Sequence, residues 1–243
     1  MKAIILCAGV SSRTQLGYPK CLYKFKDGEM LIEKNIYKLK KLGFKNKDII
    51  FATGFKSEIV KKKTKNLFNY IKNTNFKKTN MVYSLNKVIK NIKLDDILIL
   101  YSDILFEKKC LYKIIRDKRD VSTVIDIDWK KKWFKKKNYK DDLEELKIDG
   151  SKIKSLGKKV FNISGIDGRF IGITRFSKNY LKFLQEEKII KNLLTENKKI
   201  DFTNFLMHLI KTKKNIFAIK GKFNWTEFDT QDDFKLYDKE SKL

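Results

Sequence analysis

The sequence predicts an α/β fold in which a mostly parallel sheet carries helices on both faces and a small β-hairpin region is inserted. Two short, largely apolar runs, residues 3–7 and 96–101, have the length and composition of strands buried on both faces. Segments with helical spacing of apolar residues lie between them, and this alternation is typical of parallel sheets. The 243 residues contain neither a linker nor an internal repeat, so we expect a single domain over residues 1–243.

The first half of the chain alternates strands and helices. After the strand at 3–7, apolar residues at helical spacing predict a helix over 31–42, which Gly43 ends. The next elements, in order, are a strand at 48–53, a basic helix over 58–65, a short strand at 66–71, a helix over 80–92 and the strand at 96–101. Ligands bind outside the carboxyl ends of the strands in such sheets. The residues that follow the strands at 3–7 and 96–101 therefore lie on one predicted binding edge.

The second half is richer in strands. Strand-like runs occupy 121–127, 144–148, 152–156, 170–176 and 216–219, and helices are predicted over 202–210 and 231–237. Asp149-Gly150 between two of these runs is a hairpin signal. The segment from Lys130 to Lys140 is very basic, and we expect a solvated loop or helix face there.

The net charge of +27 suggests a nucleic-acid partner, but the kind of basic residue argues against one. Only five of the 56 basic residues are Arg, whereas proteins that read bases and phosphates favour the bidentate guanidinium group. Lysines spread over whole helices solvate a surface, so we expect no specific nucleic-acid binding.

Three cysteines without metal-ligand spacing indicate reduced thiols and a cytoplasmic protein. No apolar run approaches the roughly 20 residues of a membrane span, and the N-terminal run leads into polar residues without a cleavage pattern. We therefore expect no association with a membrane.

A loop of small residues follows the first strand. Its small residues are Ala8, Gly9, Ser11 and Ser12. Small side chains let backbone N–H groups approach a ligand closely, and such a concave loop suits phosphate. Arg13 and Lys20 add positive charge at the same place. The stretch from Met1 to Lys20 therefore predicts a site for a nucleoside triphosphate.

Two aspartates have two interpretations each. Asp103 follows the strand at 96–101 after Ser102, and it either binds a metal or caps a helix over 104–111. Asp229 either binds the same metal or serves a turn or cap before residues 230–232.

A series of motifs then occurs in one order along nearly the whole chain. It comprises residues 2–9 with Ser12-Arg13 and Pro19-Lys20, then 79–85, 101–103, 126–133, 157–159, 168–172 and 225–230. In this order the chain resembles the sugar-phosphate nucleotidyltransferase superfamily. More narrowly, it resembles the CTP-dependent cytidylyltransferases that act on phosphocholine or 2-aminoethylphosphonate. The chain departs from the pattern at Ser11, where a second Gly is usual, and in the short stretch between Arg13 and Pro19.

The resemblance implies a Rossmann-like fold of the nucleotide-diphospho-sugar transferase type. The implied reaction is attack of an acceptor phosphate or phosphonate oxygen on the α-phosphorus of CTP, with release of pyrophosphate. Asp103 and Asp229 would bind Mg²⁺, and Arg13 and Lys20 would hold the triphosphate. Lys158, or Lys159 beside it, would hold the acceptor phosphate, and the alternative for Lys158 is a plain position flanking the hairpin. The implied nucleotide contacts are Ala8, Gly9, Ser11, Ser12, Asn80 and Ser84. Asn80 also suits the cap of its helix, and Ser84 suits ordinary packing.

The implied partners are CTP and a small amino-bearing acceptor such as 2-aminoethylphosphonate, phosphocholine or phosphoglutamine. Trp129 and Trp133 would form an aromatic wall for a cationic acceptor, although buried Trp more often belongs to a core. The other implied acceptor contacts are Asp126 or Asp128 for the ammonium group, Arg169 for a carboxylate, and Glu227. Products of this kind supply headgroups to lipids or surface polysaccharides such as capsules, and a homodimer is left open.

Two other functions compete with this interpretation. One is a sugar-1-phosphate nucleotidyltransferase that uses another triphosphate, which would not need the tryptophan-rich stretch at 126–133. The other is a basic nucleic-acid-binding module without turnover, which would bind in a salt-sensitive way and would tolerate Asp103→Asn.

Overall fold

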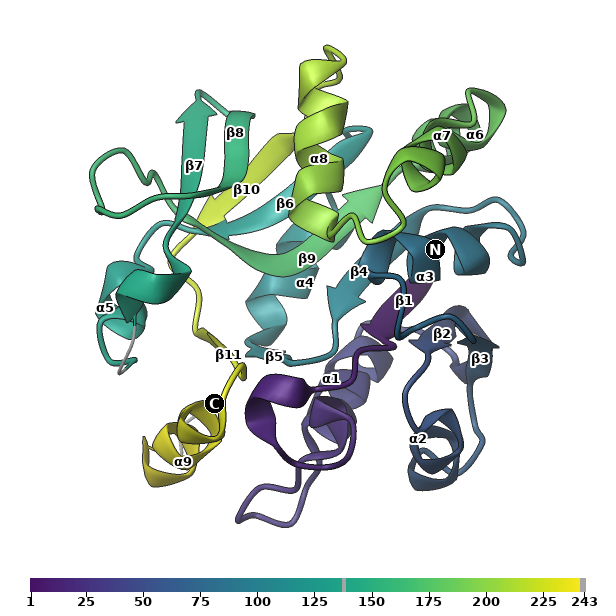
Figure 1. Ribbon diagram of the computed structural model, residues 1–243, viewed down its shortest axis with the longest axis vertical. Coiled ribbons are helices and arrows are strands. Elements are labelled where there is room, and N and C mark those ends of the chain that lie inside the picture. Colours follow the sequence, from purple (N-terminus) through teal and green to yellow (C-terminus); the bar gives the residue numbers. More distant parts are fainter. Residues whose placement is uncertain (137–138, 241–243) are drawn as a thin grey trace.

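The first four strands of the main sheet are parallel and place the amino-terminal loop at their carboxyl ends. The computed structural model describes residues 1–136 and 139–240. Its main sheet has nine strands in the order β3-β2-β1-β4-β9-β6-β10-β8-β7 (Figure 1). The parallel strands are β1 (Lys2–Cys7), β2 (Ile49–Thr53), β3 (Asn69–Lys72) and β4 (Ile97–Tyr101). Apart from the half-exposed edge strand β3, they are largely buried, as expected for strands covered on both faces.

An antiparallel strand joins this half of the sheet to the other half. Strand β9 (Arg169–Phe176) lies between β4 and β6 (Val121–Asp126) and runs antiparallel to both. Gly172 allows β9 to lie close to Tyr101 of β4, because a Cβ atom at this position would lie 2.8 Å from the ring of Tyr101. Strand β10 (Phe217–Gly221) continues the sheet parallel to β6.

The predicted hairpin exists and completes the same sheet. Strands β7 (Glu144–Asp149) and β8 (Lys152–Lys159) meet at a turn in which Gly150 has a φ of +58°. This left-handed conformation favours glycine. The hairpin is therefore the outer edge of the main sheet, bonded to β10, and not a separate unit.

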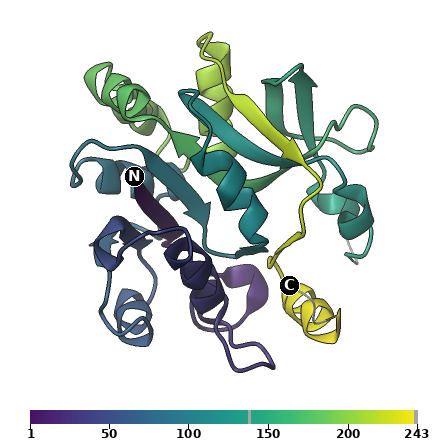
Figure 2. The ribbon, with the colours of Figure 1, turned by 180° about the vertical axis from the view of Figure 1, so that it is seen from behind.

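Helices cover both faces of the sheet. Helices α3 (Met81–Ile89), α6 (Lys178–Glu186), α7 (Ile189–Glu196) and α8 (Phe202–Lys211) lie on the face toward the viewer in Figure 1. Helices α1 (Leu31–Lys40) and α4 (Lys108–Ile115) lie on the opposite face, seen in Figure 2. The shorter helices α2 (Ser57–Lys63) and α5 (Lys130–Trp133) flank the two ends of the sheet. The predicted mixed α/β architecture is confirmed.

A second, two-stranded sheet joins the segment after β4 to the carboxyl-terminal part of the chain. Strand β5 (Ile104–Phe106) pairs antiparallel with β11 (Trp225–Glu227), and helix α9 (Gln231–Glu240) follows. A small separate core formed by Phe25, Leu31, Leu105, Phe228 and Phe234 packs α9 against the amino-terminal segment. Consequently, residues directly before β5 and directly after β11 lie side by side.

Strand β5 excludes one of the two interpretations of Asp103. A helix over 104–111 was the alternative, but residues 104–106 form a strand and the helix begins at Lys108, with Glu107 as its cap. The helix-cap interpretation of Asp103 is therefore wrong.

The basic segment after β6 also differs from expectation. Residues 130–133 form α5, and Trp133 at its end is buried. The segment thus contributes to the core in addition to presenting lysines to solvent. Positions 137–138 of the predicted segment lie outside the described residues.

Candidate active site

A cleft opens at the carboxyl ends of β1 and β4. Its volume is about 350 Å³. It gathers the predicted nucleotide and charge residues, which are Ala8, Gly9, Ser11, Ser12, Arg13, Lys20, Asn80, Ser84 and Asp103. They come from three separated parts of the chain, which meet because the carboxyl ends of parallel strands share one edge.

Ser11 shapes the amino-terminal loop in the place where glycine was expected. Its φ of +60° lies in the left-handed region, which non-glycine residues adopt at a cost. Two bonds support this conformation. The Ser11 hydroxyl accepts from the backbone N–H of Lys20 at 3.1 Å, and its carbonyl accepts from the Thr14 hydroxyl at 2.8 Å. The serine therefore makes the turn and also fixes Lys20 to it.

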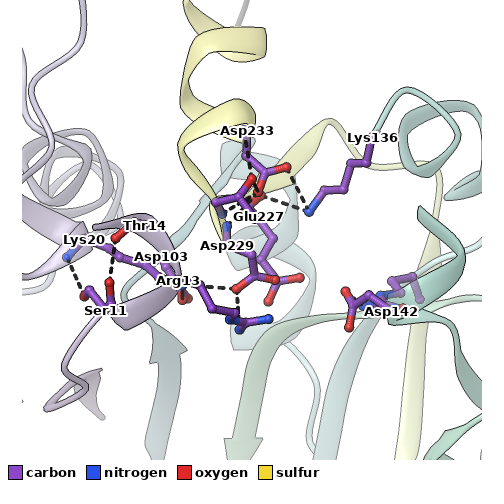
Figure 3. A network of polar contacts seen from close by, with 12 residues as sticks. Ser11, Arg13, Thr14, Lys20, Asp103, Lys136, Asp142, Glu227, Asp229 and Asp233 are labelled. Atoms are coloured by element: carbon purple, nitrogen blue, oxygen red, sulfur yellow. Dashed lines mark hydrogen bonds and ion pairs between the residues drawn. The ribbon is translucent and has the colours of Figure 1, made fainter. Parts of the chain in front are cut away.

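Lys20 forms the centre of a charged cluster. Its Nζ lies 3.0 Å from Asp103 Oδ2 and 3.0 Å from Asp229 Oδ1. The Arg13 guanidinium approaches the same Asp229 oxygen at 2.8 Å (Figure 3). Only 10% of the Lys20 side chain is exposed, so this pairing is little screened by solvent.

The pKa values of this cluster follow from its charges. Burial alone would lower the pKa of Lys20, but the charges of Asp103 and Asp229 outweigh burial and raise it. Burial would raise the pKa of Asp229, but Lys20 and Arg13 overcome this effect and lower it. Lys20 and Asp229 are therefore both charged near neutral pH.

The donors in the cluster fit a hard divalent cation. Asp103 Oδ2 and Asp229 Oδ1 converge on one positive group, the Lys20 ammonium. Carboxylate oxygens with further room for water and phosphate are what Mg²⁺ requires. The pair thus has the right chemistry for the metal that the sequence predicted.

Asn80 and Ser84 line the cleft and also serve the local structure. Asn80 is the N-cap of α3, and its side chain accepts from the N–H of Met81 at 2.8 Å. Ser84 is 3% exposed, and its hydroxyl accepts from the Asn73 amide at 3.0 Å. The cap interpretation of Asn80 is therefore correct, and its place in the cleft is compatible with it.

Asp126 is placed differently from the predicted acceptor contact. Its side chain is completely buried. Its carboxylate accepts from the Trp225 indole at 2.8 Å, from Lys132 Nζ at 2.7 Å, and from two backbone N–H groups. These internal donors occupy both carboxylate oxygens, and the bond to Trp225 connects β6 to β11.

Three further residues predicted to contact the acceptor, Asp128, Trp129 and Lys158, also lie outside the cleft. Asp128 pairs with Lys131 at 3.0 Å on the surface. Trp129 is 2% exposed and packs in the main core, which agrees with the core alternative. Lys158 on β8 is exposed and does not line the cleft described above. The ion pairs described for the charged cluster include none of these three residues.

Two cationic side chains of the protein, Arg169 and Lys136, lie close to the ring of Trp133. The Arg169 guanidinium carbon lies 3.7 Å from its ring centroid and Lys136 Nζ lies 4.2 Å from it. Arg169 also donates to the carbonyl of Asp142 at 2.6 Å and to its carboxylate at 2.8 Å. The cation–π contacts of this ring are thus made within the protein.

Glu227 stands beside the charged cluster. One carboxylate oxygen each from Asp142, Glu227 and Asp229 lies within 4.8 Å of the other two. Burial, followed by the charge of Asp229, raises the pKa of Glu227 to about 8. Asp142 could not be predicted, because it lies just after the basic segment and no local sequence pattern marks it.

A small-residue loop, two cations and a converging carboxylate pair at the carboxyl edge of a parallel sheet define a nucleotidyltransferase site. A family model described as the MobA-like NTP transferase domain matches residues 3–159, so the chain belongs to this family. The chain is also 30% identical to the CTP:phosphoglutamine cytidylyltransferase of Campylobacter jejuni, over 97% of this chain and 98% of the relative. The predicted resemblance to nucleotidyltransferases, and to their CTP-dependent branch, is confirmed.

Solved structures agree on the fold. The inositol-1-phosphate CTP transferase from T. maritima matches with a TM-score of 0.75 and 17% identity, over 97% of this chain and 94% of its own. The CTP:phosphocholine cytidylyltransferase from Streptococcus pneumoniae matches with a TM-score of 0.69 and 19% identity, over 99% of both chains. Among the described residues, none of the helices has the length and apolar character needed to cross a membrane.

Proposed function

We propose that the protein transfers CMP from CTP to the phosphate or phosphonate group of a small amino-bearing acceptor and releases pyrophosphate. The observation that carries this proposal is the meeting of Lys20 with Asp103 and Asp229 at 3.0 Å each, at the mouth of the small-residue loop. The choice of CTP is supported by the relative named CTP:phosphoglutamine cytidylyltransferase.

Each residue of the cluster has a role in this reaction. Arg13 and Lys20 hold the triphosphate and counter the charge that develops on it. Asp103 and Asp229 hold Mg²⁺, which when bound neutralises phosphate oxygens. The loop residues, with Asn80 and Ser84, bind the nucleotide. The acceptor oxygen is already anionic, so the reaction needs positioning and charge neutralisation but no general base.

The acceptor side favours a primary ammonium group over a quaternary one. A quaternary ammonium needs an open aromatic face, but Arg169 and Lys136 lie close to the ring of Trp133. A primary ammonium needs oxygen acceptors, and side-chain oxygens of Glu227 and Asp142 lie close to Asp229. We therefore rank phosphoglutamine-type and 2-aminoethylphosphonate-type acceptors above phosphocholine. Lys158 and Asp128 stay in the proposal only as outer contacts of the acceptor phosphate and amine.

We infer a cytoplasmic setting from the three buried free thiols and place the product in surface polysaccharide synthesis. A homodimer is compatible with this function.

The test is pyrophosphate release in the presence of Mg²⁺, with each of the four nucleoside triphosphates crossed with several acceptors. The acceptors are phosphoglutamine, 2-aminoethylphosphonate, phosphocholine and glucose-1-phosphate. We expect release with CTP and an acceptor that has a primary amine. Release with glucose-1-phosphate alone would replace the proposal by a sugar-1-phosphate nucleotidyltransferase. Absence of release together with tight, salt-sensitive nucleic-acid binding would replace it by a binding module.

A further inference from the structure

Asp233, in the first turn of α9, holds the backbone that carries Asp229. Its Oδ2 accepts from the backbone N–H of Asp229 at 2.9 Å, from the N–H of Thr230 at 2.8 Å, and from the Thr230 hydroxyl at 3.0 Å. Asp233 is 8% exposed. One oxygen of Asp233 therefore collects three donors. The bond from the Thr230 N–H, with the return bond from the Asp233 N–H to the Thr230 hydroxyl at 3.4 Å, forms a capping box, and the bond from the N–H of the candidate metal ligand Asp229 goes beyond it.

Lys136 binds the other side of the same turn. Its Nζ lies 3.4 Å from Asp233 Oδ1 and donates to the carbonyl of Glu227 at 3.2 Å (Figure 3). Its side chain is 15% exposed. Lys136 follows α5, so this residue of the basic segment is tied to both ends of the stretch 227–233.

Phe228 fixes the stretch from a third direction. It is completely buried, and its ring stacks on that of Phe234 with centroids 4.5 Å apart. Its backbone N–H donates to the carbonyl of Asp103 at 2.8 Å. The backbones of Asp103 and Asp229 are thus connected through one residue, while Asp233 and Lys136 close the opposite side.

We propose that Asp233 and Lys136 are positioning residues for metal binding by Asp229. They hold the Asp229 carboxylate in the direction of Asp103, and Lys136 also connects this turn to the ring of Trp133. The inference rests on the metal role given to Asp229 in the proposed function. Partners that orient a metal-ligating group typically change metal affinity by roughly 10–100-fold when they are removed.

The test measures the binding of Mn²⁺ alone, by the electron paramagnetic resonance signal of the free ion. We expect Asp233→Ala to weaken Mn²⁺ binding by about 10-fold or more. Asp232→Ala is the matched control, because Asp232 lies next to Asp233 in the same helical turn but is exposed, and its ion pair is a 3.9 Å contact with Lys235. The control should bind Mn²⁺ like the wild type.

A second pair of variants tests Lys136. Lys136→Met should weaken Mn²⁺ binding and raise the Mg²⁺ concentration needed for half-maximal rate, whereas Lys131→Met, an exposed neighbour, should change neither. Asp233→Asn keeps an oxygen for the backbone donors and loses the charge facing Lys136. The Mn²⁺ affinity of Asp233→Asn should lie between those of the wild type and Asp233→Ala. This variant replaces Asp233→Ala in the test if Asp233→Ala does not fold.

Three outcomes decide the inference. The inference is overturned if Asp233→Ala has a lower melting temperature but an unchanged Mn²⁺ affinity, because the role of Asp233 would then be purely structural. The same result in both Asp233→Asn and Lys136→Met would overturn it equally. If Asp229→Asn loses Mn²⁺ binding but the Asp233 variants do not, only this inference fails. If Asp229→Asn itself binds Mn²⁺ like the wild type, the metal assignment in the proposed function fails.

Discussion

Lys20 Nζ lies 3.0 Å from Asp229 Oδ1 although the two residues are 209 positions apart in the sequence. The pairing of β5 with β11 makes this contact, because it brings Asp229 to the carboxyl edge of β4, where Asp103 also contacts Lys20. The two carboxylates proposed to hold Mg²⁺ therefore hold the Lys20 ammonium in this structure. A bound metal ion and the Lys20 ammonium would therefore compete for the carboxylate oxygens of Asp103 and Asp229.

The first prediction follows from that competition. Lys20→Met should lower kcat by about 100-fold or more, because a group that counters charge on the triphosphate is lost. The same change should strengthen the binding of Mn²⁺ alone, since two partly buried carboxylates lose their internal cation. Titration with Mn²⁺ and steady-state kinetics measure the two effects. Lys24→Met, on an exposed residue of the same segment, is the control. A parallel loss of activity and Mn²⁺ affinity in Lys20→Met would contradict the competition.

The second prediction concerns the strained turn at Ser11. Ser11→Ala loses the bond to the Lys20 N–H but keeps a Cβ atom at a φ of +60°. Ser11→Gly loses the same bond and relieves the backbone. The glycine variant should therefore be the more stable of the two by about 1 kcal/mol. Urea unfolding measures this difference, and equal stabilities would show that the turn is not strained.

The third prediction is a pH dependence at the far end of the sheet. Asp96 accepts from Arg175 Nη2 at 2.6 Å and from the Lys178 N–H at 2.7 Å. Burial opposes ionisation of Asp96, but these donors overcome it and lower its pKa below the ordinary 3.8. A lowered pKa means that the stabilisation is present above pH 3.8 and is lost as the pH falls through the value in the folded protein. Asp96→Asn should cost about 2 kcal/mol at pH 7 and progressively less below about pH 4.

The neighbouring aspartate gives the control for Asp96. Asp95 pairs with the amino terminus at 2.7 Å but is 38% exposed. Asp95→Asn should cost less than about 1 kcal/mol of unfolding free energy at pH 7. Chemical unfolding at several pH values compares the two variants. A constant cost for Asp96→Asn from pH 7 to pH 3 would exclude the linkage.

The fourth prediction concerns Arg169, which the sequence suggested as a partner for an acceptor carboxylate. Both of its Nη atoms already donate to Asp142, and its guanidinium lies on Trp133. Arg169→Ala should therefore raise KM for phosphoglutamine and 2-aminoethylphosphonate by similar factors, because it disturbs Asp142. The KM values of both acceptors measure this. An increase confined to the carboxylate-bearing acceptor would instead support direct contact with Arg169.

The sequence predicted the parts of the site that depend on local pattern. The apolar runs of β1 and β4 and the small-residue loop are contiguous, so they located Lys20 and Asp103 at one edge of the sheet. The hairpin turn at Gly150 was predicted for the same reason, since its chemistry lies within a few residues.

The parts that depend on pairing between distant segments were not predictable in this way. Strands β5 and β11 are three residues each and carry no periodicity long enough to detect. Asp126 had the residue type of an amine-binding group, and only its burial against Trp225 and Lys132 shows that its charge is used internally. Lys136 looked like any other lysine of a basic segment until α9 placed Asp233 beside it.

The most direct test of the proposed reaction follows the α-phosphorus of CTP itself. CTP labelled at that phosphorus is incubated with the enzyme, Mg²⁺ and phosphoglutamine, and the products are separated. We predict that the label moves into a cytidine diphosphate-linked product only when the acceptor is present, and that Asp103→Asn abolishes this transfer. Label that remains in CTP with every amino-bearing acceptor, or a transfer that Asp103→Asn leaves intact, would contradict it.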